Sequence, residues 1–178
     1  SFLTKAVKTV KDKSGRSINY LRISVTDKCN LRCRYCMPEP VPDVEHEEIL
    51  RYEEILRICE AAVRVGIRNF KITGGEPLVR KDCVDFMRRL KETDGVETVT
   101  LTTNGMFVKE YIAEFKHMGL DGINISLDTL DRKQFHRLTG TDGADAVVEA
   151  VSACASAGLK TKVNSVLLSE TKSQILRL

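Results

Sequence analysis

Three cysteines, Cys29, Cys33 and Cys36, stand within eight positions in the stretch "TDKCNLRCRYCMP" (26–38). An odd number of closely spaced thiols does not fit a set of disulfides, and a structural zinc site normally closes its coordination with four protein ligands. Closely spaced cysteines are the usual ligands of iron–sulfur clusters. Three of them would give a cubane cluster three irons with protein ligands and one without. The stretch therefore predicts a [4Fe–4S] cluster with one open iron, where chemistry can take place.

A zinc site completed by a distant ligand such as His46, or three unrelated thiols, is the alternative interpretation. The basic neighbours Lys28, Arg32 and Arg34 are expected to lower the pKa of the thiols and to offset the charge of a cluster. The other cysteines, Cys59, Cys83 and Cys154, lie on apolar faces of predicted helices and are expected to pack in the core. The three histidines, His46, His117 and His136, share no ligand spacing with one another.

The elements that must position the cysteines alternate between strand and helix. Runs of β-branched residues predict strands at 20–26, 69–75, 99–105, 122–128 and 160–168, and spacings of three and four predict helices at 52–65, 82–92, 109–118 and 144–157. This alternation predicts a parallel sheet covered by helices. The cysteine stretch, "GGEP", "TTNG" and "SLD" each fall at the carboxyl end of a predicted strand, where such folds place their sites. Contributions from four or five strands favour a (β/α) barrel over a doubly wound sheet.

Composition and chain length limit the classes of protein to which the chain can belong. The chain has 178 residues and a formal net charge of +3, which is too small to indicate a nucleic-acid partner. No apolar stretch approaches the roughly 20 residues of a membrane helix. With no signal peptide at the N-terminus, a reducing, cytoplasmic location is expected. Because "SETKSQILRL" begins a helix and a barrel needs more strands, residues 1–178 are interpreted as one α/β barrel domain, truncated after the fifth strand and incomplete at its C-terminus.

A C-x-x-x-C-x-aromatic-C loop after the first strand resembles the radical S-adenosylmethionine (SAM) superfamily. The resemblance implies a partial (β/α) barrel of the radical SAM type, with a cluster whose open iron chelates the methionine end of SAM. It implies Tyr35 as a contact for the adenine end, and "GGEP" (74–77) as the segment that receives the methionine amino group. Gly75 and Ser126 match further cofactor-binding positions. From the residues themselves, two glycines let the backbone approach a ligand closely, and Glu76 supplies an acceptor.

The motifs "ITGGEPLVR", "LTTNG", "INISLDTLD" and "KVN", in this order after the cysteine stretch, resemble the GTP 3′,8-cyclases of molybdenum-cofactor biosynthesis. That resemblance implies a lyase in which a 5′-deoxyadenosyl radical takes the ribose C3′ hydrogen of GTP, after which the sugar closes onto C8 of guanine. It implies four residues as GTP contacts: Arg22, Lys71, Thr102 and Lys162. Arg22 and Lys162 can meet triphosphate oxygens by charge-assisted hydrogen bonds. Lys71 stands where the family commonly has arginine; it keeps the charge but lacks the planar, two-pronged donor.

The same family holds GTP with a second, C-terminal [4Fe–4S] cluster, and nothing after Cys154 supplies its cysteines. The second cluster is therefore expected only in a longer parent protein, and this chain alone is expected to be inactive as a cyclase. Radical chemistry also requires an electron donor, while the sequence leaves the oligomeric state, including a homodimer, open. Two alternatives remain: another radical SAM enzyme acting on a peptide or small molecule, and a non-catalytic iron–sulfur protein. An electron carrier has no need for an open iron, so four protein ligands would be expected there.

Overall fold

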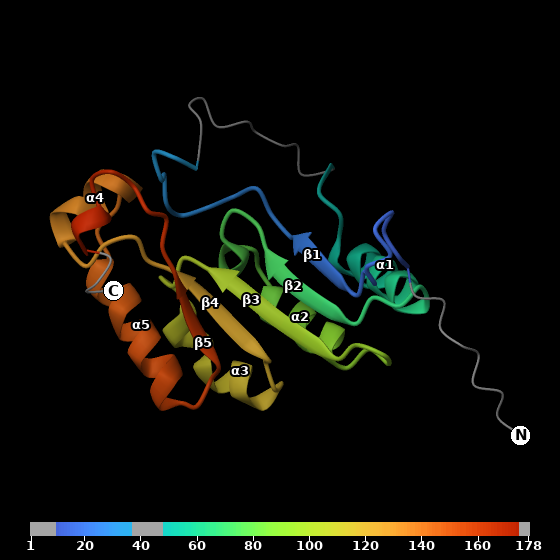
Figure 1. Cartoon of the computed structure of the whole chain (residues 1–178). Helices are drawn as coiled ribbons and strands as arrows, with labels where there is room; N and C mark the ends of the chain where they lie inside the picture. The colour runs from blue at the N-terminus through green and yellow to red at the C-terminus, as the bar shows by residue number, and fades with distance from the viewer. Residues whose placement is uncertain (1–9, 37–47, 175–178) are drawn as a thin grey trace, which may run out of the picture.

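Five strands build one sheet in the structure, a computed structural model that describes residues 10–36 and 48–174. They are β1 (Tyr20–Ser24), β2 (Asn69–Thr73), β3 (Thr98–Thr103), β4 (Gly122–Ser126) and β5 (Thr161–Asn164). All neighbouring pairs are parallel, and the strands lie side by side in chain order (Figure 1). A doubly wound sheet reverses its strand order at a switch point, whereas a barrel adds each strand beside the last. The observed order is that of a barrel, and all five predicted strands are confirmed.

The helices follow the strands as the barrel pattern requires. They are α1 (Tyr52–Arg64), α2 (Cys83–Lys91), α3 (Ile112–His117), α4 (Arg132–Thr139) and α5 (Ala144–Ser156), with 3-10 turns η2 (Pro77–Val79), η3 (Val108–Tyr111) and η4 (Lys172–Gln174). The predicted helices at 52–65, 82–92 and 144–157 are confirmed, while the one predicted at 109–118 is divided into η3 and α3. Helix α4 was not predicted. Its start is capped by Asp131, which accepts a hydrogen bond from the amide of Gln134 (2.7 Å), and Gly140 ends it with a φ of 72°.

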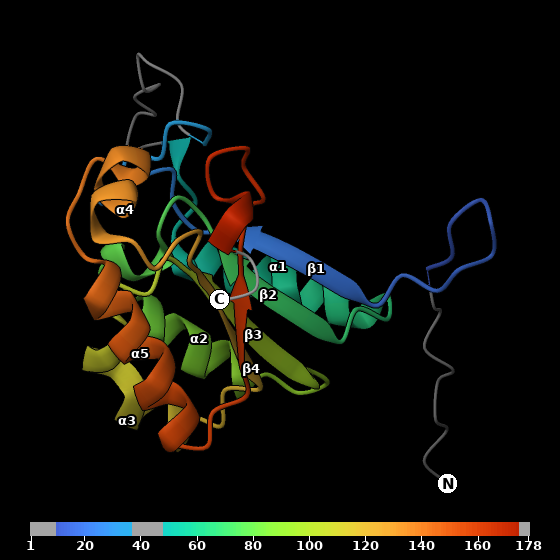
Figure 2. The same ribbon diagram turned by 60° about the vertical axis from the view of Figure 1, so that its left-hand side comes forward.

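The two faces of the sheet differ in composition and in what covers them. Alternate residues of the central strands are fully buried beneath the helices, among them Phe70, Ile72, Leu101 and Ile125. Helices α1, α2, α3 and α5 lie on this apolar side, as the two ribbon views show (Figures 1 and 2). Cys59, Cys83 and Cys154 are at most 2% exposed and belong to this core, as predicted. The opposite face carries polar residues and no helix among the described residues.

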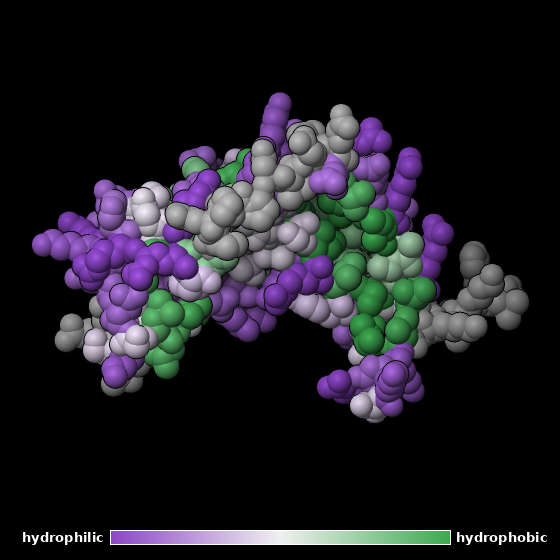
Figure 3. All heavy atoms as spheres, turned by 90° about the horizontal axis from the view of Figure 1, so that it is seen from above, coloured by the Kyte–Doolittle hydropathy of each residue, from purple (hydrophilic) through white to green (hydrophobic). Residues whose placement is uncertain are grey.

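Seen from above, hydrophilic side chains gather on the side of α4, and apolar side chains gather on the side of β1 and α1 (Figure 3). Ile18, Tyr20, Leu50 and Ile58, which lie in or beside these two elements, are 41–49% exposed. The described part of the chain contains no helix with the length and apolarity needed to cross a lipid bilayer.

Candidate functional site

The uncovered face of the sheet brings the predicted substrate contacts together. In the register of β1 and β2, Arg22 pairs directly with Lys71. Further along the sheet, Asn124 pairs with Thr102 on one side and with Lys162 on the other. Side chains of residues paired in a parallel sheet, and of residues two apart in one strand, share a face. One polar face therefore carries the predicted contacts from all five strands, namely Arg22, Lys71, Thr102, Ser126 and Lys162.

The loop after β1, which carries the cysteines, lies against the "GGEP" segment after β2. The amide of Gly75 donates to the carbonyl of Thr26 (2.7 Å), and the amide of Glu76 donates to that of Lys28 (2.8 Å). A Cβ atom at Gly75 would lie 2.4 Å from the carbonyl oxygen of Lys28 and 2.5 Å from that of Asp27. Close backbone approach was expected of these glycines, but the partner that the structure shows is the cysteine loop itself.

Glu76 is fully buried, and both of its carboxylate oxygens have protein donors. Oε1 accepts from the amide of Leu78 (3.1 Å) and the hydroxyl of Thr103 (2.8 Å), while Oε2 accepts from the amide of Asn104 (2.6 Å). Burial raises the pKa of the Glu76 carboxyl, and these hydrogen bonds oppose that rise. The Glu76 carboxylate therefore joins the loops after β2 and β3, and its expected role as an acceptor for a ligand stays a prediction.

The loop after β3 reaches the first cysteine through Asn104, a residue that the sequence analysis did not single out. Its amide nitrogen donates to the side-chain oxygen of Asn30 (2.8 Å) and lies 3.8 Å from the sulfur of Cys29. The backbone amide of Leu31 donates to the same sulfur (3.4 Å). N–H donors to cysteine sulfur are one means by which proteins tune a thiolate-bound cluster. The only sequence signal for Asn104 was its place within "TTNG".

The far end of the cysteine loop is held by α4 and by the end of β4. The amides of Arg32 and Arg34 donate to the last two carbonyls of α4 (2.8 and 3.0 Å). The hydroxyl of Tyr35 donates to Oδ2 of Asp128 at 2.5 Å, and Oδ1 of Asp128 accepts from the amide of Val166 (2.8 Å). The cysteine loop is therefore hydrogen-bonded to three later segments of the chain, those that follow β2, β3 and β4. Helix α4 was not predicted, and the only sequence signal for Asp128 was its place within "SLD".

The three cysteine side chains of the loop are free thiols; Cys29 and Cys33 are half-buried and Cys36 is exposed. Within residues 10–36 and 48–174, no three His, Cys, Asp or Glu side chains are already assembled closely enough to hold a metal ion. His46, the alternative zinc ligand, lies outside the described residues. Three thiols on one short loop, with N–H donors already directed at the sulfur of Cys29, fit the donor set of a cluster with one open iron.

The pKa values of the Cys29 and Cys33 thiols move in the direction opposite to the one predicted. Burial raises the pKa of Cys29 and raises that of Cys33 to about 11. Arg32 and Arg34 do not reverse this effect, because their guanidinium groups are directed elsewhere. Arg32 donates to the carbonyl of Cys29 (2.5 Å), and Arg34 lies 3.8 Å from Glu170. The prediction of lowered thiol pKa values is therefore wrong for Cys29 and Cys33 in the metal-free chain.

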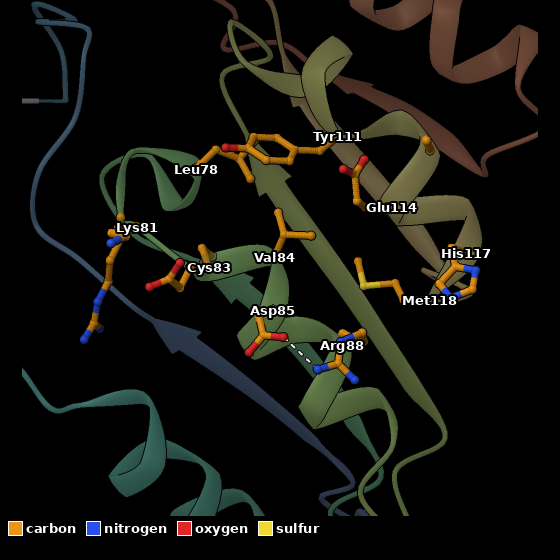
Figure 4. A pocket seen from close by; sticks show the side chains of 13 residues that line it. Leu78, Lys81, Cys83, Val84, Asp85, Arg88, Tyr111, Glu114, His117 and Met118 are labelled. Carbon is orange, nitrogen blue, oxygen red and sulfur yellow. Dashed lines mark hydrogen bonds and ion pairs between the residues drawn. The ribbon is translucent and has the colours of Figure 1, made fainter.

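A groove of about 620 Å³ lies on the helical side of the sheet, between α2 and α3 (Figure 4). It is lined by apolar side chains such as Leu78, Val84 and Met118 together with polar and charged ones, among them the ion pair of Asp85 with Arg88 (2.7 Å). None of the predicted site residues lines it. The polar face of the sheet, with the cysteine loop at its carboxyl end, is therefore the candidate site.

The chain is similar in sequence to curated proteins of one kind. Two curated GTP 3′,8-cyclases illustrate the similarity. That of Peptoclostridium acidaminophilum is 48% identical over 159 residues, covering 88% of this chain and 49% of the relative. That of Clostridium perfringens (strain 13 / Type A) is 41% identical over 171 residues, covering 95% and 53%. The chain thus spans about half the length of the curated relatives it matches.

Solved structures share the fold at low sequence identity. The crystal structure of Streptococcus suis SuiB superposes with a TM-score of 0.72 at 24% identity, covering 89% of this chain and 35% of that one. The structure of anSMEcpe with bound AdoMet gives a TM-score of 0.71 at 19% identity, covering 88% and 44%. The prediction of a partial (β/α) barrel is confirmed. A family model described as the Radical SAM superfamily matches residues 23–178, and the chain belongs to that superfamily.

Proposed function

We propose that this chain carries the cofactor-binding half, and part of the GTP site, of a GTP 3′,8-cyclase. Membership of the superfamily implies a [4Fe–4S] cluster and SAM. Cys29, Cys33 and Cys36 would hold the cluster. SAM would lie against the carboxyl ends of the strands, at Tyr35, Gly75 and Ser126. When bound, the two groups would supply the radical that removes the ribose C3′ hydrogen of GTP.

The observation that carries the GTP assignment is a set of cations on the polar face of the sheet. Arg22 and Lys71 occupy directly paired positions, about 5 Å apart between neighbouring strands. Lys162 extends the same face across β5. Within residues 10–36 and 48–174, none of the three has an ion-pair partner. Placing like charges side by side is unfavourable, and a bound polyanion offsets it.

This arrangement favours a nucleoside triphosphate over a neutral substrate. The three cations can bind phosphate oxygens by charge-assisted hydrogen bonds, and Thr102 can orient the substrate by its hydroxyl. A neutral peptide, the substrate class of the alternative, would leave these charges uncompensated. The relatives named GTP 3′,8-cyclase support the same choice.

We propose that the second cluster and the remaining GTP contacts belong to the part of the relatives that this chain does not span. The chain alone is then expected to be inactive as a cyclase. An electron donor would reduce the cluster in the cytoplasm.

Calorimetric titration of the chain with GTP tests the proposal. Arg22→Ala and Lys162→Ala are each expected to weaken GTP binding about tenfold or more, because each removes charged hydrogen bonds to phosphate. Arg57→Ala, which removes an exposed cation from α1 on the other side of the sheet, is the matched control and should leave affinity unchanged. Inorganic triphosphate should compete with GTP. Equal affinities in the wild type and both site variants would refute the assignment.

A further inference from the structure

The side chains of Tyr35 and Asp128 form a contact that links two distant parts of the chain. Tyr35 is 44% exposed, yet its hydroxyl donates to Oδ2 of Asp128 at 2.5 Å across 93 residues. Asp128 is only 9% exposed, and its other oxygen accepts from the amide of Val166 at 2.8 Å. The carboxylate therefore receives one hydrogen bond from the cysteine loop and one from the segment after β5.

The surroundings of Asp128 make it the fixed member of the pair. Its neighbour Leu127 donates its amide to the carbonyl of Asn164 (2.9 Å) and accepts at its own carbonyl from the hydroxyl of Ser165 (2.5 Å). Leu127 itself is 4% exposed. The backbone that leads into Asp128 is thus tied by two hydrogen bonds to the end of β5 and the residue after it.

The cysteine loop around Tyr35 is held more lightly. Between the second and third cysteines, the backbone bonds are those from Arg34 to the end of α4 (3.0 Å) and from Cys36 to the carbonyl of Cys33 (2.9 Å). Cys36 is exposed. Within residues 10–36, the phenol of Tyr35 is the side chain of this turn that reaches a buried partner. It is therefore the contact whose loss would release the turn.

We propose that Asp128 is a positioning residue, which holds the turn of residues 33–36 through Tyr35 before any cofactor binds. The last two cysteines and the backbone at Tyr35 are then in place for the cluster and for the adenine end of SAM. This inference deepens the proposed function, and only its cofactor part rests on that function. The anchoring of the turn is a property of the metal-free chain and can be measured there.

Amide hydrogen exchange of the metal-free full chain tests the anchor. Tyr35→Phe removes this hydrogen bond and keeps both the ring and the carboxylate, while Asp128→Asn removes the charge of its acceptor. Each is expected to speed exchange at the amides of Arg34 and Cys36 about tenfold. The double variant should match Tyr35→Phe, because there is one bond to lose. Asp145→Asn, which neutralises an exposed carboxylate on α5, is the control and should leave both amides unchanged.

Unchanged exchange rates at the amides of Arg34 and Cys36 in Tyr35→Phe would overturn the anchor. So would a double variant in which the two single changes speed exchange independently, so that their factors multiply. The effect of the anchor on cofactor binding is measured separately, as the affinity of the reconstituted chain for SAM, with samples compared at equal iron content. Tyr35→Phe and Asp128→Asn are expected to weaken SAM binding several-fold without loss of iron, and unchanged SAM affinity in both overturns that part. If the wild type bound no SAM while the exchange results held, the anchor would stand and the proposed function would fail.

Discussion

Gly75 offers the sharpest test of how the cysteine loop is built onto the sheet. The change Gly75→Ala would place a Cβ atom 2.4 Å from the carbonyl oxygen of Lys28, 2.5 Å from that of Asp27 and 2.7 Å from the carbonyl carbon of Lys28. Ordinary contacts of this kind lie at 3.4–4 Å. All three atoms belong to the backbone, so no side chain can rotate away and the loop must move.

The cost of Gly75→Ala can be worked from these contacts. Forcing an extra methyl group into a packed site costs about 1–3 kcal/mol. Moving the loop also strains two backbone hydrogen bonds, from Gly75 to Thr26 (2.7 Å) and from Glu76 to Lys28 (2.8 Å), each worth about 1 kcal/mol. We therefore expect the free energy of unfolding to fall by about 2–4 kcal/mol, and iron retention after reconstitution to fall with it.

Urea denaturation and iron analysis measure the two effects. Gly122→Ala, in β4, is the matched control, because it adds the same methyl group where a Cβ atom would meet nothing closer than 3.5 Å. Its unfolding free energy and iron content should stay near those of the wild type. If Gly75→Ala had the same free energy of unfolding as Gly122→Ala and held as much iron, the close contacts of Gly75 would not contribute to stability, and the reasoning would be wrong.

Three further perturbations test the site. Glu76→Gln should lower the free energy of unfolding by about 1–3 kcal/mol, because one of its three donors then faces an amide NH₂. Burial raises the Glu76 pKa above 4.5, so the stability that the neutral carboxyl contributes is complete below that value and is lost as pH rises. The margin of wild type over Glu76→Gln should therefore narrow towards alkaline pH in urea titrations, and a widening margin would contradict this. Cys33→Ala should lose the cluster with little loss of fold by circular dichroism, whereas Cys154→Ala in the core should keep its iron; equal iron in both would remove Cys33 from the ligand set. Lys71→Arg should tighten GTP binding several-fold in calorimetry, since the guanidinium adds a planar, two-pronged donor, and weaker binding would place Lys71 away from the phosphates.

The strands and most helices could be predicted because their signals are local. Runs of β-branched residues located every strand, but the first four end two residues earlier than expected. Their final residues turn into the loops of the site instead of continuing the ladder. Helix α4 was missed because its apolar signal is short, with Phe135 and Leu138 buried among charged neighbours. Its caps, Asp131 and Gly140, were the available signal.

The residues of the candidate site could be predicted from the sequence, but the long-range contacts between them could not. Alternation along the strands places Arg22 and Lys162 on one face without any knowledge of the fold. The contact of Asn104 with Cys29 spans 75 residues and that of Tyr35 with Asp128 spans 93, so no local pattern indicates either. The pKa of Cys33 could not be predicted either, because burial in the folded loop outweighs the charge of its sequence neighbours.

Electron paramagnetic resonance of the anaerobically reconstituted and reduced chain, with and without SAM, tests the central claim most directly. The claim is that Cys29, Cys33 and Cys36 hold a cluster with one iron left open for the cofactor. A [4Fe–4S] signal that changes when SAM is added is the predicted result. A signal indifferent to SAM, or a chain that binds zinc and forms no cluster, would contradict it.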